Sequence, residues 1–388
     1  MNDLKKKMLS LQDFESHARG HLPRPIFGYI SGGVEDNASL RANRSVFDQW
    51  AFKPRMLIDV SARSQSVQLF GERYETPFGI APMGITALTG YRGDLALATA
   101  AAESGIAAVL SAFSLIRMEE VIQAAPRTWF QAYLPGDFSK IAALIDRVAA
   151  AGFRTLVLTI DSPVIANREN NIRTGFTTPL QPSLRLAWDG IVRPRWTVGT
   201  FLRTLVVNGM PHFENMLAER GEAIISAGVL HTEAGRSKLN WSHVEEIRRQ
   251  WKGNLVIKGI LSVEDALIAR ARGADGVVLS NHGGRQLDGA VSPMEILADV
   301  VEAMGDTPVM IDSGFRRGSD VLKAVALGAR MVFVGRPFNY ALTAGGASGV
   351  RHAIGLLRDE VDRDMALLGV TSCGEMSPKV LLRRPLAP

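Results

Sequence analysis

The chain has 388 residues, 46% of them hydrophobic, which is enough for one large barrel or for two ordinary domains. A net charge of +5 favours anionic partners, but the arginines are scattered and no nucleic-acid-binding module is present, so we expect no nucleic-acid partner. The single cysteine, Cys373, excludes an internal disulfide. We expect no signal peptide, and no apolar run reaches the roughly 18 residues that cross a bilayer.

The first 70 residues precede the first strand of the pattern described below. They begin with a helix that we expect to be capped at Ser10, and residues 31–36 are rich in turn formers. We interpret residues 1–70 as a cap on the rest of the chain. Residues 1–388 then form a single domain.

Eight short apolar runs recur along the chain, most of them followed by a helical pattern. They span residues 77–81, 106–110, 128–133, 155–160, 255–258, 276–279, 308–311 and 331–334. Helical stretches cover residues 93–104, 139–151, 262–272, 294–304 and 319–327, and Ser262 is a predicted N-cap. Strands that alternate with helices predict a parallel (β/α)8 TIM barrel over residues 71–336. Residues 337–388 are expected to form terminal helices.

One connection is much longer than the others. About 100 residues separate the fourth strand from the fifth, whereas the other spacings are roughly 20–30 residues. A long insertion over residues 170–240 is therefore expected at the carboxyl end of strand four. In barrels of this kind an insertion on that face covers the active site.

Polar or glycine-rich segments follow all eight predicted strands, where barrel enzymes carry their catalytic groups. They contain Pro82, Met83 and Gly84; Ser111; Gln131 and Tyr133; Thr159 and Asp161; Lys258; Ser280 and His282; Asp312; and Gly335 and Arg336. Strand six leads into Ser-Asn-His-Gly-Gly-Arg-Gln-Leu-Asp-Gly at 280–289. A histidine carries protons near neutral pH, and an arginine can hold a carboxylate through two parallel hydrogen bonds. His282 beside Arg285 therefore suits proton abstraction from a small acid.

The last two strands are followed by glycines and arginines, at 311–318 and 334–337. This is the usual phosphate site of such barrels, so backbone N–H groups with Arg316 or Arg336 are expected to bind a phosphate monoester. Triphosphate-binding and Rossmann motifs are absent. Lys258 lies between apolar residues and needs an anionic partner or a lowered pKa. An imine-forming amine, a fixed cation beside a reduced cofactor and a structural ion pair all remain open for it.

These segments together resemble the FMN-dependent 2-hydroxy-acid dehydrogenases and oxidases, which include bacterial L-lactate and (S)-mandelate dehydrogenases. The resemblance rests on 280–289, Lys258-Gly, Leu-Thr-Ile-Asp at 158–161, Asp-Ser-Gly-Phe-Arg-Arg-Gly at 312–318 and Gly-Arg-Pro at 335–337. These motifs appear in the family's order, and the likeness runs from about residue 10 to about residue 380.

The resemblance implies FMN as cofactor and a role for each matched residue. His282 would take a proton from the substrate, and Asp161 would orient it and stabilise its imidazolium. The substrate carboxylate and hydroxyl would be held by Arg285, Arg168, Tyr133 and Tyr29. Lys258 would stabilise the reduced flavin. The flavin ring would be lined by Pro82, Met83, Gly84, Ser111, Gln131, Thr159 and Ser280. The ribityl chain would contact Asp312, and the phosphate would contact Gly314, Arg316, Gly335 and Arg336.

Three positions differ from the family pattern. Phe113 stands where glycolate oxidases have tryptophan, Ile30 stands where they have a tyrosine, and the family's Asp-Gly-Gly is Asp-Ser-Gly here. None of these removes a proposed catalytic group, but substrate identity does not transfer from the glycolate enzymes.

The expected reaction is oxidation of an (S)-2-hydroxy acid, mandelate-like or L-lactate-like, to the 2-oxo acid, with electrons passed to a membrane quinone. The alternatives are a soluble oxidase that uses oxygen, a redox-neutral flavin isomerase and a non-catalytic FMN-binding protein. The resemblance also implies a homo-oligomer, a tetramer.

Residues 177–215 interleave apolar side chains with arginines. Such a segment suits the surface of an anionic bilayer, so we expect peripheral attachment on the cytoplasmic side of the inner membrane. The alternative is that these side chains pack on the barrel or on another subunit of a soluble cytoplasmic enzyme.

Overall fold

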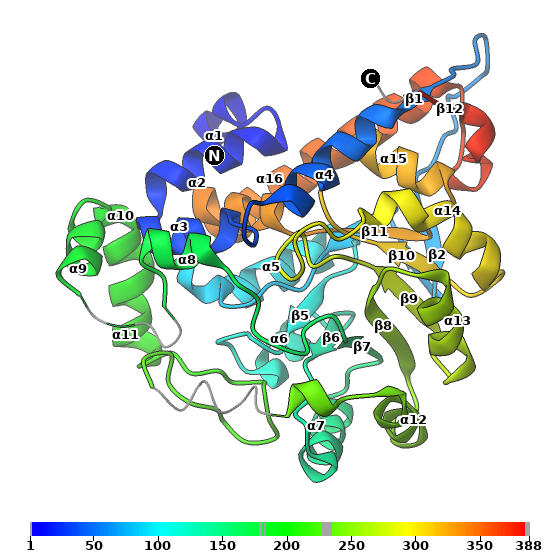
Figure 1. Ribbon diagram of the computed structural model, residues 1–388. Coiled ribbons are helices and arrows are strands. Elements are labelled where there is room, and N and C mark those ends of the chain that lie inside the picture. Colours follow the sequence, from blue (N-terminus) through cyan, green and yellow to red (C-terminus); the bar gives the residue numbers. More distant parts are fainter. Residues whose placement is uncertain (1, 178–180, 182, 227–234, 385–388) are drawn as a thin grey trace.

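The computed structural model describes residues 2–177, 181, 183–226 and 235–384. At its centre lies an eight-stranded parallel sheet with the strand order β4-β11-β10-β9-β8-β7-β6-β5 (Figure 1). A bridge between Ile80 and Ala108 joins the first and last strands of this order and closes the ring. The prediction of a (β/α)8 barrel is therefore confirmed.

Each barrel strand overlaps one of the predicted apolar runs. The strands are β4 (Phe78–Ile80), β5 (Val109–Ser111), β6 (Trp129–Ala132), β7 (Thr155–Thr159), β8 (Asn254–Ile260), β9 (Gly276–Leu279), β10 (Val309–Ile311) and β11 (Met331–Val334). Seven of them are buried along their whole length. Because helices cover one face of a parallel barrel and its own core fills the other, such strands are continuous apolar runs.

Helices surround the barrel. They are α5 (Gly93–Glu103), α6 (Met118–Ala124), α7 (Phe138–Ala150), α12 (Trp241–Gln250), α13 (Val263–Ala271), α14 (Pro293–Met304), α15 (Gly318–Ala326) and α16 (Arg336–Leu368). The Ser262 hydroxyl accepts a hydrogen bond of 3.1 Å from the N–H of Asp265, so it caps α13 as predicted.

The N-terminal segment forms several helices outside the barrel. They are α1 (Asn2–Lys7), α2 (Leu11–His21), α3 (Arg24–Ser31), α4 (Ala38–Ser45) and the short η1 (Val46–Gln49). At the start of α2 the Asp13 carboxylate accepts a hydrogen bond of 2.8 Å from the N–H of Ser10. The helix predicted at Ser10 is present, although α1 precedes it. Helix α2 packs along α16, with Phe14 fully buried (Figure 1).

Two small antiparallel sheets were not predicted. The first pairs β2 (Val67–Leu69) with β3 (Glu72–Tyr74), and its Leu69 and Tyr74 pack against Trp129 and Phe333 inside the barrel. This hairpin crosses the boundary expected at residue 70, and it covers the end at which the barrel strands begin.

The second small sheet pairs β1 (Trp50–Phe52) with β12 (Leu381–Arg383). After α16 the chain forms η6 (Cys373–Glu375) and η7 (Pro378–Val380) before it reaches β12. The prediction of helices throughout 337–388 is therefore wrong for its last part, because the N-terminal segment supplies a strand partner there. Residues 385–388 lie outside the described residues.

The long connection between β7 and β8 leaves the barrel on one side (Figure 1). It contains α8 (Glu169–Thr174), α9 (Leu184–Ile191), α10 (Pro194–Trp196), η3 (Thr197–Leu202), α11 (Arg203–Asn208) and η5 (Arg236–Lys238). Residues 178–180, 182 and 227–234 of the predicted insertion lie outside the described residues. In the part of the chain that is described, no helix combines the length and the apolarity needed to cross a bilayer.

Trp196 anchors this connection to the barrel. Its indole N–H donates a hydrogen bond of 2.7 Å to the carbonyl of Leu88, at the end of η2 (Thr86–Leu88), and its ring stacks on Phe201. Trp196 was among the apolar side chains expected at a membrane surface, but it is buried against the barrel. Others on the same connection remain exposed: Leu184 by 93%, Val206 by 85% and Trp188 by 63%.

Candidate active site

His282 lies just beyond the end of β9 in a left-handed backbone conformation, with φ of 58°. Its Nδ1 donates a hydrogen bond of 2.9 Å to Oδ1 of Asp161, which lies beyond the end of β7. The hydroxyl of Tyr133, beyond the end of β6, lies 3.2 Å from His282 Nε2. The imidazole is thus held between a carboxylate at Nδ1 and a phenol at Nε2.

The buried surroundings keep this histidine neutral. Burial lowers the pKa of His282 below its ordinary value, although the Asp161 carboxylate acts to raise it. Burial acts to raise the pKa of Asp161, but His282 and then Lys258 bring it below its usual value. Burial also raises the pKa of Tyr133. At neutral pH the site therefore holds a carboxylate, a neutral imidazole that can accept a proton, and a neutral phenol.

Asp161 reaches this position because β8 makes room for it. The pairing of β8 with β9 shifts register between Lys258 and Ile260, and the intervening Gly259 has φ of 104°. A Cβ atom at Gly259 would lie 2.6 Å from Cβ of Asp161. Only glycine allows both this conformation and this close approach.

Lys258 is a buried cation with two partners. Its Nζ lies 3.2 Å from Oδ2 of Asp312, beyond the end of β10, and donates a hydrogen bond of 2.8 Å to the hydroxyl of Ser280. The same hydroxyl accepts a hydrogen bond of 3.0 Å from the N–H of His282. The anionic partner that the sequence required for Lys258 is Asp312.

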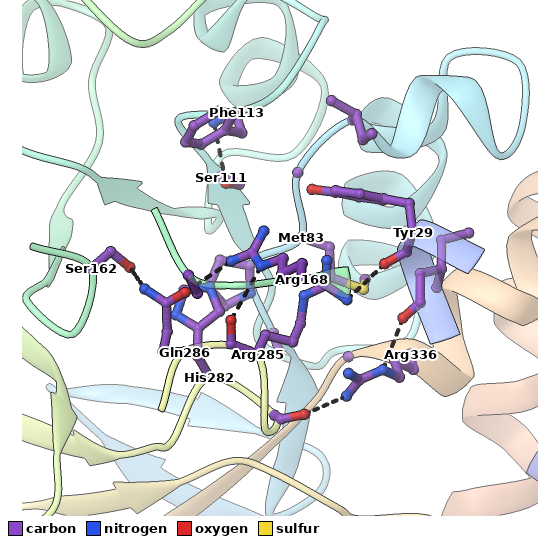
Figure 2. Close-up of a pocket in the computed structure, with 18 of the residues that line it drawn as sticks. Tyr29, Met83, Ser111, Phe113, Ser162, Arg168, His282, Arg285, Gln286 and Arg336 are labelled. Atoms are coloured by element: carbon purple, nitrogen blue, oxygen red, sulfur yellow. Dashed lines mark hydrogen bonds between the residues drawn. The ribbon is translucent and has the colours of Figure 1, made fainter. Parts of the chain in front are cut away.

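Arg285 and Arg168 lie beside His282 (Figure 2). Arg285 donates hydrogen bonds of 2.6 and 2.7 Å to the carbonyls of Tyr29 and Gly32, and Arg168 donates one of 2.9 Å to Oε1 of Gln286. Burial, and next the charge of Arg168, lower the pKa of Arg285 to about 9. Among the described residues neither arginine forms an ion pair with a carboxylate, so the site can accept a ligand anion.

The two arginines predicted at the phosphate site have different surroundings. Arg336 donates hydrogen bonds of 2.9 to 3.0 Å to the carbonyls of Ile30, Gly32 and Gly283, and burial lowers its pKa to about 10. Within the part of the chain that is described, the Arg316 guanidinium donates one hydrogen bond, of 3.3 Å, to the carbonyl of Phe315. The Arg336 side chain therefore connects the segments that carry these carbonyls, whereas the Arg316 guanidinium keeps more N–H donors available to bind an anion.

These residues surround one cavity of about 530 Å³ (Figure 2). Sixteen of the predicted site residues line it: Tyr29, Pro82, Met83, Gly84, Ser111, Tyr133, Thr159, Arg168, Lys258, His282, Arg285, Asp312, Gly314, Arg316, Gly335 and Arg336. The other three lie behind this lining. Asp161 supports His282, Ser280 supports Lys258, and Gln131 accepts a hydrogen bond of 2.9 Å from Ser111.

The match to one protein family covers nearly the whole chain. The family described as FMN-dependent dehydrogenase matches residues 18–383. The chain belongs to this family. Among its relatives, (S)-mandelate dehydrogenase of Pseudomonas putida is 39% identical over 97% of this chain and 95% of its own length. L-lactate oxidase of Nostoc is 36% identical over 96% of this chain and 98% of its own length.

Solved structures agree with the sequence relatives. The crystal structure of the monotopic membrane protein (S)-mandelate dehydrogenase superimposes on this chain with a TM-score of 0.88. The two are 38% identical, and the match covers 97% of this chain and 100% of that one. A mandelate oxidase bound to (S)-2-phenylpropionate gives a TM-score of 0.80 at 35% identity, covering 97% of this chain and 98% of that one.

FMN is the cofactor of this dehydrogenase family, and the cavity suits it. Its volume lies within the roughly 300–1,000 Å³ typical of cofactor sites. Beside the flavin-ring residues, Gln131 Nε2 is a buried donor that no described residue accepts from. Arg316 and the glycines after β10 and β11 line the end where such barrels bind phosphate. Donors and an arginine thus remain for the ring and phosphate of FMN.

Several residues of this site were not predicted. The Gln286 amide donates hydrogen bonds of 2.9 Å to the carbonyl of Asp161 and 2.6 Å to the hydroxyl of Ser162. Asn281 and Asn43 exchange two side-chain hydrogen bonds, each of 2.8 Å. Gln286 lies within the segment 280–289, so a polar amide next to Arg285 could have been recognised from the sequence as a candidate site residue. Asn43 lies in α4, and nothing in its local sequence indicates a contact with residues 280–289.

Proposed function

We propose that this protein oxidises an (S)-2-hydroxy acid to the corresponding 2-oxo acid, with His282 as the base. The observation that carries the proposal is the 2.9 Å hydrogen bond from His282 Nδ1 to Asp161, which keeps the proton of the neutral ring on Nδ1 and leaves Nε2 unprotonated, beside the Tyr133 hydroxyl, to take a proton inside the cavity. Two arginines lie in the same part of the cavity, where Figure 2 shows Arg168, Arg285 and His282 gathered together.

Each proposed residue has one task. Arg285 and Arg168 bind the substrate carboxylate, and Tyr133 is placed to hydrogen bond to the substrate hydroxyl. His282 Nε2 takes a proton from the substrate, and Asp161 stabilises the imidazolium that results. The chemistry that bound FMN supplies is acceptance of the two electrons. Pairing with Asp312 favours the fixed-cation role for Lys258, because an imine-forming lysine must lose its charge.

An aryl side chain on the substrate fits the lining best. Beyond the arginines the cavity is bounded by apolar side chains, namely Phe113, Val164, Ile165, Ile172, Phe176, Phe213 and Ile224. A methyl group would leave much of this surface in contact with water, whereas a phenyl ring would cover it. We therefore favour a mandelate-like acid. L-lactate is the second candidate, because lactate dehydrogenases and an oxidase are among the relatives.

Peripheral attachment to a membrane, and with it a quinone acceptor, is the second part of the proposal. On α9 and α11 the side chains of Leu184, Trp188 and Val206 are exposed, and the exposed Arg185 and Arg203 lie among them. Exposed apolar side chains with basic neighbours suit an anionic bilayer surface. One similar structure is titled a monotopic membrane protein. The proposed face is the cytoplasmic side of the inner membrane.

Anaerobic mixing of the FMN-loaded enzyme with candidate acids tests the activity. We expect (S)-mandelate to bleach the flavin and L-lactate to bleach it more slowly. If no 2-hydroxy acid bleaches the flavin, the proposed activity is refuted in favour of the alternative of a non-catalytic FMN-binding protein. Admission of air then separates the acceptors, since rapid reoxidation would indicate an oxidase. The variant His282→Gln should retain FMN but lose roughly 10²–10⁴-fold in the rate of bleaching. A wild-type rate in this variant would refute the assignment of the base.

A further inference from the structure

Ser313 lies between two loops that build the site. The base loop (residues 280–289) carries His282, and the phosphate loop (residues 312–318) carries Asp312. The Ser313 hydroxyl donates a hydrogen bond of 2.8 Å to Oδ1 of Asp312. It also accepts one of 3.1 Å from the N–H of Gly283, the residue after His282. One hydroxyl therefore joins the two loops.

This contact completes a ring of hydrogen bonds around Lys258. The ammonium group contacts Asp312 at 3.2 Å on one side and the Ser280 hydroxyl at 2.8 Å on the other. Ser280 in turn accepts from the N–H of His282 at 3.0 Å. Two serine hydroxyls thus connect the Lys258–Asp312 pair to the N–H groups of two consecutive residues of the base loop.

The backbone of Ser313 gives a second, independent observation. Its φ is 79°, in the left-handed region that glycine adopts without cost. His282 is also left-handed, with φ of 58°. A non-glycine residue in this conformation is destabilising and persists where surrounding contacts hold it, often at active sites. The two hydrogen bonds of the Ser313 hydroxyl are contacts that can hold the residue in this conformation.

We infer that Ser313 is a positioning residue for the base. Through the N–H of Gly283 it fixes the backbone that orients His282, and through Asp312 it fixes the carboxylate that pairs with Lys258. The inference rests on the proposed function, in which His282 takes the substrate proton.

Two variants of the full FMN-loaded enzyme separate the hydroxyl from the strain. Ser313→Ala removes the hydroxyl and keeps a strained non-glycine residue, whereas Ser313→Gly removes both. Both variants should slow substrate-driven flavin bleaching roughly 10- to 100-fold, since misplacing a catalytic group by about 1 Å costs about that much. In both, hydrogen exchange of the Gly283 amide should become at least about tenfold faster. Ser313→Gly should nevertheless melt at a higher temperature than Ser313→Ala.

Thr343→Ala is the matched control. Thr343 is as buried as Ser313, at 8% exposure, but among the described residues its hydroxyl bonds only within α16, to the carbonyl of Tyr340. This variant should bleach and exchange as the wild type does. A wild-type bleaching rate in Ser313→Gly, or wild-type protection of the Gly283 amide in both serine variants, would show the inference to be wrong. If no 2-hydroxy acid bleaches the wild type, the proposed function fails, and exchange at Gly283 still decides whether Ser313 holds the loop.

Discussion

Replacing Asp161 by asparagine tests how the base is activated. The carboxylate oxygen lies 2.9 Å from His282 Nδ1, and both groups are buried. At an effective dielectric constant of about 20, a unit charge at this separation stabilises the imidazolium by about 6 kcal/mol. An asparagine side chain still accepts a hydrogen bond from Nδ1, so part of the stabilisation of the imidazolium is retained. A loss of about 4 kcal/mol corresponds to a roughly 10³-fold slower proton transfer.

Stopped-flow measurement of anaerobic flavin bleaching as a function of pH provides the assay. Asp161 raises the pKa of His282 against the effect of burial, so its removal lowers that pKa further. The acid limb of the rate profile, below which the base is protonated, should therefore move to lower pH while the plateau falls. Asp137→Asn, at the exposed N-cap of α7, is the control and should leave the profile unchanged. A wild-type plateau in Asp161→Asn would refute the proposed role.

Two further predictions concern the cofactor and the membrane. Lys258→Met should lower the two-electron reduction potential of bound FMN by roughly 40 mV, because a loss of about 2 kcal/mol of charge stabilisation corresponds to that shift, and it should also weaken the sulfite adduct. Lys323→Met is the control for this measurement. An unchanged potential in Lys258→Met would place Lys258 away from the flavin. The triple variant Leu184→Asn, Trp188→Asn and Val206→Asn should lose at least about tenfold in co-sedimentation with anionic vesicles at low salt, because each side chain contributes roughly 1.5–3 kcal/mol when buried. The control Leu382→Asn lies on β12 and should bind as the wild type does, and failure of the wild type to co-sediment would remove the membrane proposal.

The barrel was predictable because its signals are local. Each strand is a short apolar run, and the chemistry of a parallel barrel lies at the carboxyl ends of those runs. His282, Asp161 and Lys258 could therefore be selected from their places at strand ends, and the structure brings them together. The cap of α13 at Ser262 follows from equally local chemistry.

The remaining features depend on contacts between distant segments. Strand β12 forms because Trp50–Phe52 lies beside it, and no pattern in its three residues indicates that partner. The burial of Trp196 depends on the carbonyl of Leu88, which lies far away in sequence. Ser313 was noticed only as a departure from the family pattern, because its two hydrogen bonds become visible only when the base loop is placed against it.

The reciprocal amide pair of Asn43 and Asn281 can form only late in the synthesis of the chain. The two residues are 238 positions apart, so Asn43 in α4 lacks its partner until more than two thirds of the chain has left the ribosome. Helix α2 lacks its packing partner for even longer, because α16 is synthesised near the end of the chain. An N-terminal fragment thus exposes apolar residues such as Phe14 and has no organised base. Contacts between such distant segments form slowly, and incomplete chains remain inactive and prone to recognition by chaperones.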